Sequence, residues 1–406
     1  MTPPSTDQRI IFALSSFAGL VSGADPGPDP EKLLYQRILQ KLKQYESQLG
    51  KWNVVWGPCV VAPSTFYYPM NAMYVAQSAG NPANYVVAVA GTNPYSLFDW
   101  LIEDALVEKQ LPWLFDETAG AAISLGTAIG LSILLNMAPD GDRPSAGRSL
   151  RQFLFDLEDK NILLTTGGHS LGGALAPVLA LWLADIQRLW DPFKRVKLAS
   201  MPTAGPTAGN ESFAEYSDCK IPTSRWWNSL DVVPHAWNSG LLSEIPSLYG
   251  PEIPADEAVD LLVGWARDAS SRGDYTQIKP CTPAFAGTVD AGIVDPSRSE
   301  IDNFLEQAAC QHTAAYTKYF ALPGVDLLPM SGLMAQTKPI RLSSVLRASE
   351  RTGTVPPPAL LDAALEAGPV TVPIAGKSVL LPRSASDPGT AAIARQVQAE
   401  LQKAAA

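Results

Sequence analysis

The amino-acid sequence predicts an α/β protein with a mostly parallel central sheet and helices on both faces. Three continuous apolar runs, at 85–90, 162–166 and 196–201, have the length and composition of strands buried on both faces. Helix-like segments at 148–159 and 174–189 precede the second and third runs. Strands that alternate with helices of this length are typical of βαβ units, whose crossovers are right-handed.

The chain before these runs adds further elements. Apolar residues recur at helical spacing through 30–49, and Gly50 ends the pattern, which predicts an amphipathic helix. The apolar run 53–61 predicts a strand. Residues 72–77 follow Asn71, a favourable N-cap, and predict the start of a helix.

Two apolar stretches raise the question of export or membrane contact. Residues 10–21, with the small residues 22–24 after them, have the length of a signal-peptide core, but Arg9 is offset by an acidic neighbour. A signal peptide over 1–24 and an N-terminal helix packed on the body both stay open, and so do a secreted and a cytoplasmic location. Residues 118–137 are uncharged but rich in Gly and Ala, which favours a buried strand and helix over a membrane span.

Composition divides the chain into three parts. We expect an N-terminal helical segment over 1–51, a main α/β domain over 52–321, and an appendage over 322–406 packed on the main domain. Residues 238–310 are rich in Pro, Gly, Ser and Asp, which favours a cap-like insertion over a site. Apolar runs that flank 374–377 predict a hairpin in the appendage.

The charge balance bears on partners. The net charge of −10 and the lack of any long Lys/Arg run exclude nucleic acid as an expected partner. An acidic chain is also repelled by anionic membranes, so contact with lipid has to be hydrophobic.

Histidines and cysteines argue against a metal site. The chain has three histidines, and a metal hydrolase would need nearly all of them. The four cysteines include no C-x-x-C spacing and allow three full pairings or none. A Cys281–Cys310 disulfide, which would hold the insertion beside His312, is one hypothesis.

The strongest local signal is the G-x-S-x-G motif at 168–172. It follows a predicted strand at once and a helix-forming run begins at Gly173, so Ser170 would stand on a strained turn above the sheet. The flanking glycines are needed where strand and helix approach closely, and the helix N-terminus supplies positive potential. We interpret Ser170 as a nucleophile; the alternative is a plain structural turn.

A serine nucleophile needs a base, and the base needs an orienting carboxylate. In doubly wound hydrolases the chain order is serine, acid, histidine, which eliminates His169 as the base. His235 lies only four residues after Asp231, too close to dock across a site as that acid's partner. His312, 81 residues after Asp231, is the expected base, with His235 as the alternative.

The acid is expected at the end of a strand. Residues 225–231 predict a strand followed by a loop, which places Asp231 at the strand's carboxyl end. The competing carboxylates lie on a helix-like stretch and are Glu211, Glu215 and Asp218.

Acyl transfer also needs hydrogen-bond donors for the oxyanion. The backbone N–H of Leu171, directly after the nucleophile, should supply one. The second should come from the loop after the strand 85–90, where Thr92 could offer its N–H and its hydroxyl. An ordinary Gly-Thr turn is the alternative for this loop.

Together these residues resemble the fungal-type (class 3) lipase family, over roughly residues 52–320. The matching segments are VVAVAGTNPYSLFDWL at 86–101, TTGGHSLGGALA at 165–176, PTAGPTAGNESFAEY at 202–216, RWWNSLDVVPH at 225–235 and QHTAAYTKY at 311–319. The resemblance implies an α/β-hydrolase-type fold, hydrolysis of acylglycerols or related lipid esters, possible action at an oil–water interface, and no cofactor. Ala90 stands where the family often has an arginine before the Gly-Thr pair.

The resemblance also implies a mobile lid over about 93–106. Its apolar face would be formed by Phe98, Trp100, Leu101 and Ile102, although core packing is an alternative for these side chains. The family's acidic residue after the tryptophan could be Glu103 or Asp104. We assign His169 and His235 to the wall of the substrate pocket.

Three functions compete. The first is a serine lipase or carboxylesterase that acts on acylglycerols through an acyl-enzyme. The second is the same machinery acting on a phospholipid or polyester. The third is a hydrolase-like scaffold kept for binding, which predicts a lost triad, whereas every triad position here is filled.

Overall fold

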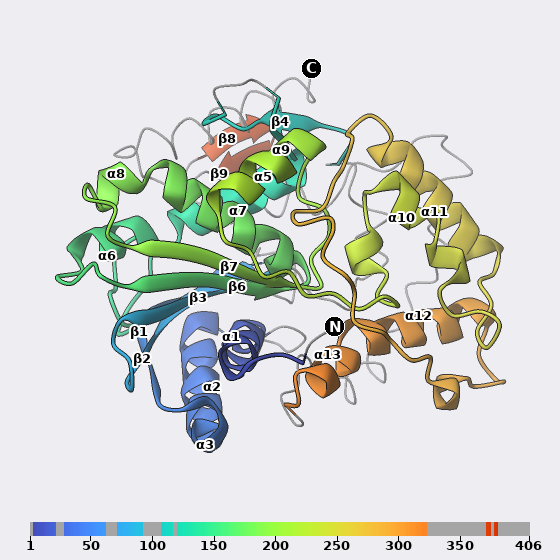
Figure 1. Cartoon of the computed structure of the whole chain (residues 1–406), viewed down its shortest axis with the longest axis horizontal. Helices are drawn as coiled ribbons and strands as arrows, with labels where there is room; N and C mark the ends of the chain where they lie inside the picture. Colours follow the sequence, from blue (N-terminus) through green and yellow to red (C-terminus); the bar gives the residue numbers. More distant parts are fainter. Residues whose placement is uncertain are drawn as a thin grey trace.

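The computed structural model describes residues 3–21, 28–61, 71–91, 107–116 and 120–322, and two strands at 371–374 and 377–380. Its centre is a five-stranded sheet with helices on both faces (Figure 1). The strand order is β1-β2-β3-β6-β7. The strands are β1 (Trp52–Val61), β2 (Asn71–Ser78), β3 (Asn84–Ala90), β6 (Leu163–His169) and β7 (Lys197–Thr203).

The sheet is mixed, where the sequence pattern predicted mostly parallel pairing. The three apolar runs recognised in the sequence are β3, β6 and β7, and these strands pair in parallel. Strands β1 and β2, and β2 and β3, pair antiparallel. Only residues 79–83 connect β2 to β3, and a parallel crossover needs a dozen residues or more, so this link can only be a hairpin.

The helix expected at 72–77 is wrong, because these residues belong to β2. The run pairs with a strand on each side, from Ala72 opposite Ala90 to Gln77 opposite Tyr85 on β3. Ala and Met are good helix formers, but intrinsic propensity is a small effect, and burial between two strands overrides it.

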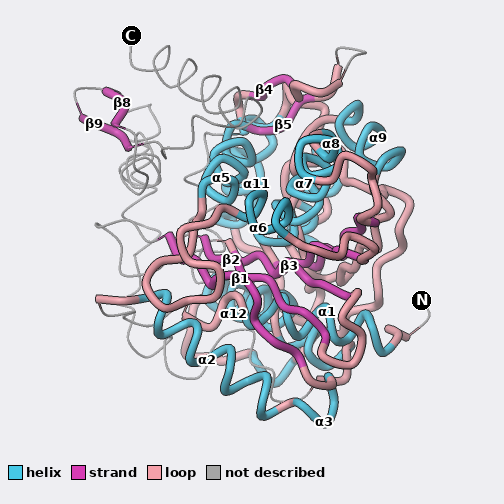
Figure 2. The backbone as a smooth tube through the Cα atoms, turned by 90° about the vertical axis from the view of Figure 1, so that its left-hand side faces the viewer, coloured by secondary structure: helices cyan, strands magenta, loops and turns pink. Residues whose placement is uncertain are grey.

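One face of the sheet is covered by the N-terminal helices, as Figures 1 and 2 show. These are α1 (Thr6–Phe17), α2 (Pro30–Gln44) and α3 (Glu46–Leu49). Phe12, Leu14 and Phe17 of α1 are fully buried, and Tyr74 of β2 donates a hydrogen bond to the Leu14 carbonyl over 2.6 Å. The signal-like stretch 10–21 is therefore built into the fold as a layer against the sheet, which supports its interpretation as a packed N-terminal helix.

The other face carries the helices α5 (Leu125–Asn136), α6 (Leu150–Asp156), α7 (Leu171–Asp185), α8 (Gln187–Trp190) and α9 (Glu211–Lys220). The apolar stretch 118–137 ends in the buried α5, which follows the short strand β5 (Ala122–Ser124); β5 pairs with β4 (Gln110–Pro112). This is the strand and helix predicted for that stretch. Within the described part of the chain, every helix is too short or too polar to cross a membrane.

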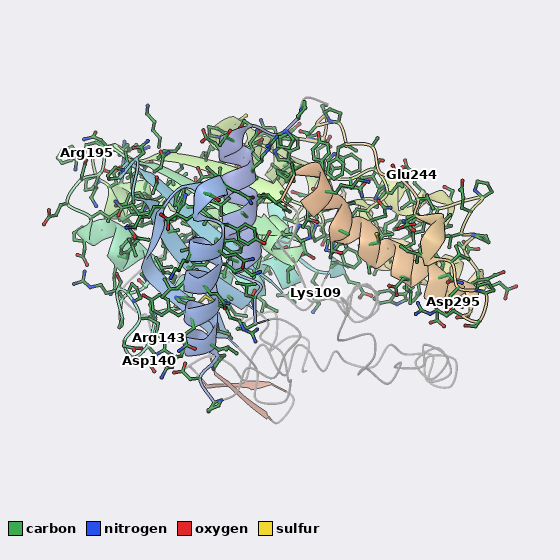
Figure 3. The ribbon with its side chains drawn as sticks, turned by 90° about the horizontal axis from the view of Figure 1, so that it is seen from below. Lys109, Asp140, Arg143, Arg195, Glu244 and Asp295 are labelled. Atoms are coloured by element: carbon green, nitrogen blue, oxygen red, sulfur yellow. The ribbon has the colours of Figure 1, made fainter. Side chains whose placement is uncertain are left out.

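Residues 233–319 form a helical region beside the sheet, at the right of Figure 1. Seen from below in Figure 3, its residues Glu244 and Asp295 lie at the opposite end of the molecule from Arg195. Most of its buried apolar side chains, Val263 and Phe304 among them, belong to a hydrophobic cluster that is distinct from the two clusters against the sheet. The elements are η3 (Val233–His235), α10 (Ser239–Leu242), η4 (Ile245–Ser247), α11 (Glu257–Ser270), η5 (Ala291–Ile293), α12 (Glu300–His312) and α13 (Ala314–Tyr319).

Several expectations fall outside the described residues. These are the lid segment 93–106 with Phe98, Trp100, Leu101, Ile102, Glu103 and Asp104, the oxyanion candidate Thr92, and most of the appendage 322–406. Within the appendage, β8 (Thr371–Ile374) pairs antiparallel with β9 (Lys377–Leu380), as the predicted hairpin requires. Cys281 and Cys310 are both free, so the hypothesis of a bridge between them is wrong.

Candidate active site

Ser170 stands on the turn between β6 and α7. Strand β6 ends at His169 and α7 begins at Leu171, which leaves Ser170 alone between them with φ +61° and ψ −131°. A positive φ strains any residue other than glycine, and such strain persists only where the surroundings impose it. The Ser170 N–H donates to the Thr203 carbonyl of β7 over 3.1 Å, which fixes the turn against the next strand.

Glycines allow this turn because its backbone segments touch. A Cβ on Gly168 would stand 2.0 Å from the Gly172 carbonyl oxygen, and a Cβ on Gly172 would stand 2.3 Å from the Val89 carbonyl oxygen. Both obstacles are backbone atoms, which cannot swing aside as a side chain can. The glycine pattern of the motif is therefore a packing requirement of the strand, turn and helix.

His312 and Asp231 form a buried pair. His312 Nδ1 lies 2.9 Å from Asp231 Oδ2 and 3.0 Å from Oδ1, and both side chains are fully buried. Because a carboxylate only accepts hydrogen bonds, Nδ1 carries the proton that faces it. In the neutral ring the other nitrogen, Nε2, is then the proton acceptor. His312 Nε2 is buried and has no hydrogen-bond partner among the described residues.

The carboxylate of Asp231 is itself held by two further donors. The Val233 N–H donates to Oδ1 over 3.0 Å, and the Tyr316 hydroxyl donates to Oδ2 over 2.8 Å. Burial and the nearby Asp231 charge raise the pKa of Tyr316 well above its usual value, so the phenol keeps its proton. This contact of Tyr316 with Asp231 was not predicted from the sequence. Its only signal was its place four residues after His312, inside the segment 311–319.

Asp231 follows an extended segment, where the sequence predicted a strand. Residues 225–231 form no strand, and single bridges join Trp226 to Thr203 of β7 and Asn228 to Phe285. One bridge on each side is too little for a ladder, yet it aligns the segment with the carboxyl end of β7. The competing carboxylates lie on α9, where Asp218 contacts Lys279.

His235 lies behind the acid. Its Nδ1 is 2.6 Å from the backbone carbonyl oxygen of Asp231, and its ring is buried edge-on against Trp227. Burial, above all, lowers its pKa. His235 thus contacts the backbone of Asp231 while His312 contacts the carboxylate, so the structure gives no support to His235 as the base.

His169 lies in a helix interface. Its Nε2 is 2.8 Å from the His312 carbonyl oxygen and its Nδ1 is 3.2 Å from Thr203 Oγ1. Its ring centroid is 4.8 Å from that of His312, and Phe12 of α1 and Tyr316 of α13 meet it edge-on. Thr203 belongs to β7, and the other neighbours belong to α1, α12 and α13. A place in the wall of the substrate pocket stays a prediction for His169.

The end of β3 meets the turn at Ser170. A Cβ on Gly91 would stand 2.6 Å from Leu171 Cβ, so the residue before Thr92 touches the first residue of α7. As that first residue, Leu171 has an N–H with no acceptor inside the helix. The described parts of the chain contain no cluster of three or more His, Cys, Asp or Glu side chains placed to hold a metal ion.

Comparisons with known proteins relate the chain to lipases. The family model described as Lipase (class 3) matches residues 143–240. The crystal structure of M37 lipase shares 31% identity and a TM-score of 0.69, over 79% of this chain and 93% of that chain. Lipase II from Rhizopus niveus shares 19% identity with a TM-score of 0.40, over 59% of this chain and 78% of that chain. No curated protein sequence matches the chain.

Proposed function

The chain belongs to the class 3 lipase family and has its α/β-hydrolase fold, and we propose that it hydrolyses acylglycerols or related lipid esters through an acyl-enzyme on Ser170. One observation carries the proposal. The buried Asp231–His312 pair leaves His312 Nε2 without a partner, and His169, the neighbour of Ser170, contacts His312 directly.

In the acylation step, His312 Nε2 takes the proton of the Ser170 hydroxyl while Oγ attacks the ester carbonyl carbon. The imidazolium that forms is stabilised by the Asp231 carboxylate. It also stands at the C-terminal end of α12, where the helix dipole favours positive charge. The Leu171 N–H and Thr92 hold the oxyanion, and each such donor contributes about 10²–10³-fold in rate.

Collapse of the tetrahedral intermediate expels the alcohol, which receives the proton from His312. Water then attacks the acyl-enzyme with His312 again as the base, and the fatty acid leaves. Tyr316 acts by holding Asp231, to which its hydroxyl donates.

The test compares the wild type with Ser170→Ala on p-nitrophenyl esters of rising chain length, emulsified triglyceride and phospholipid. We expect Ser170→Ala to lower kcat by about 10⁶-fold, because removing the nucleophile of a serine hydrolase leaves only binding and the oxyanion donors. A fluorophosphonate should add to Ser170 in the wild type, as read by mass spectrometry.

Ser145→Ala is the matched control, since Ser145 also adopts a positive φ but donates to the Val55 carbonyl, away from the site. It should keep wild-type activity and labelling. A wild type that resists the fluorophosphonate and cleaves no ester would favour a non-catalytic scaffold, while cleavage of phospholipid alone would change the substrate class.

A further inference from the structure

We propose that His169 is a positioning residue, which holds the base in register with the nucleophile by donating a hydrogen bond from Nε2 to the backbone carbonyl of His312. The inference rests on the proposed roles of Ser170 and His312. It assigns a function to the variable residue of the serine motif that precedes the nucleophile.

The last four carbonyls of a helix have no hydrogen-bond donor inside it and accept from groups outside it. His312 is the last residue of α12, so its carbonyl is one of these. Each of the four final carbonyls has a donor: Ala309 accepts from Thr313 Oγ1 (2.7 Å), Cys310 from the Thr313 N–H (3.3 Å), Gln311 from Asn228 Nδ2 (3.0 Å) and His312 from His169 Nε2 (2.8 Å). Thr313 is local, whereas Asn228 and His169 are distant in the sequence.

These two distant donors matter because α12 otherwise packs away from the sheet. Its buried residues Phe304 and Ala308 belong to the hydrophobic cluster of the helical region, which is separate from the two clusters that cover the sheet. The bond from His169 therefore links the helix that carries the base to the strand that carries the nucleophile. Since His169 directly precedes Ser170, the link between the two catalytic residues is one side chain long.

The ring of His169 is fixed in the form that this role needs. A carbonyl only accepts hydrogen bonds, so Nε2 carries the proton. Burial, and then the neighbouring His312, hold the pKa of His169 well below its usual value, so the ring stays neutral. Phe12 meets the ring edge-on and stacks on Phe320 at 4.2 Å between centroids, so the N-terminal helix α1 supports its orientation.

The test uses two variants of similar length. In His169→Gln the amide nitrogen occupies about the position of Nε2 and can still donate to the His312 carbonyl. In His169→Met no donor remains. For each protein, the fraction of molecules that a fluorophosphonate finally labels gives the number of competent sites, meaning sites whose Ser170 can react. The labelling rate, and kcat and KM for a soluble p-nitrophenyl ester, are then expressed per competent site.

We expect His169→Met to lower kcat and the labelling rate per site by about 10- to 100-fold with KM within about twofold, because a displacement of about 1 Å in a catalytic group costs up to 10²-fold. His169→Gln should recover most of this loss. The result that overturns the proposal is a His169→Met protein with fewer competent sites but wild-type kcat per site. Equal losses in both variants would also overturn it, because the ring and not the donor would then matter.

Lys160→Met is the matched control. Lys160 Nζ caps the C-terminal end of α6 by donating to the Leu154 and Phe155 carbonyls (2.5 and 2.9 Å), so this variant also removes a side-chain cap from a helix end. It should lower Tm without changing kcat per site. A wild type that does not label or hydrolyse would contradict the proposed function itself, and this result is distinct from any pattern among the His169 variants.

Discussion

Ser170 and His312 belong to two regions that are held together by different means. Ser170 is positioned by backbone packed on backbone, within one strand, one turn and one helix that are consecutive in the sequence. His312 ends a helix of the neighbouring region and is positioned by individual hydrogen bonds. Its Nδ1 donates to the Asp231 carboxylate, which Tyr316 holds in turn, and its carbonyl accepts from His169.

This difference predicts two kinds of failure. Changes on the nucleophile side should disturb the fold, because the atoms in contact cannot move apart locally. Changes on the base side should disturb the chemistry first, because each hydrogen bond there orients one group while the surrounding core stays packed.

Asp231→Asn should give the largest effect on the base side. An amide can present its N–H₂ to His312 Nδ1, which would leave the ring proton on Nε2 and remove the base. We expect kcat to fall by about 10⁴-fold with little change in Tm. Steady-state kinetics together with thermal unfolding measure the two quantities on the same samples.

Asp191→Asn controls for the loss of a buried carboxylate. Asp191 is as fully buried as Asp231 and accepts from Gln187 and the Val196 N–H, at the end of the sheet away from the site. It should alter stability and leave kcat intact. If Asp231→Asn kept more than a tenth of wild-type kcat, the base would not depend on this carboxylate. Hydrogen bonding to Asp231 would then not be what orients His312.

Gly168→Ala should give the largest effect on the nucleophile side. The new methyl group would overlap the Gly172 backbone, so strand and helix must separate. We expect a loss of about 3 kcal/mol or more in the free energy of unfolding. The activity lost should follow the fraction of protein that unfolds or fails to label, which denaturant titration and fluorophosphonate counting measure.

Gly264→Ala is the opposite case on α11. A Cβ there meets nothing within 4 Å, and alanine favours a helix over glycine by about 1 kcal/mol. This variant should be slightly more stable and fully active. A Gly168→Ala protein that folds normally would show that the turn is less tightly packed than the backbone distances indicate.

The same division explains what the sequence could predict. The strand, the turn at Ser170 and the helix are consecutive in the sequence. Their apolar runs and glycines can pack together in few ways, so the local sequence is enough to predict this structure. Strands β3, β6 and β7 were predictable for the same reason. Strand β2 was not, because Ala72, Met73 and Ala76 suit a helix and only the two flanking strands decide otherwise.

On the base side the sequence indicates residue types but not contacts. The chain order selects His312 and Asp231 as candidates, and the structure pairs them. Tyr316 and the carbonyl contact of His169 could not be predicted, because both depend on how α12 and α13 dock beside the sheet. Nothing within a few residues of Tyr316 or His169 encodes that docking.

Tyr316→Phe should give the smallest effect of the three and the sharpest comparison between the regions. It removes the donor to Asp231 Oδ2 and leaves the buried Asn228 N–H without its acceptor. We expect kcat per competent site to fall by about 10- to 100-fold, since a hydrogen bond to a charged group contributes about 1.5–3 kcal/mol.

Tyr74→Phe makes the same chemical change in the sheet layer, where the equally buried hydroxyl donates to the Leu14 carbonyl over 2.6 Å. It should cost about 1 kcal/mol of stability and leave kcat per site unchanged. Because size, burial and the atom removed are the same, any difference in kcat between the two variants measures what the Tyr316 hydroxyl does for Asp231 and the Asn228 N–H together. Equal kcat in Tyr316→Phe and Tyr74→Phe would mean that Val233 and His312 alone fix the carboxylate, and that the base side is held by packing as firmly as the nucleophile side.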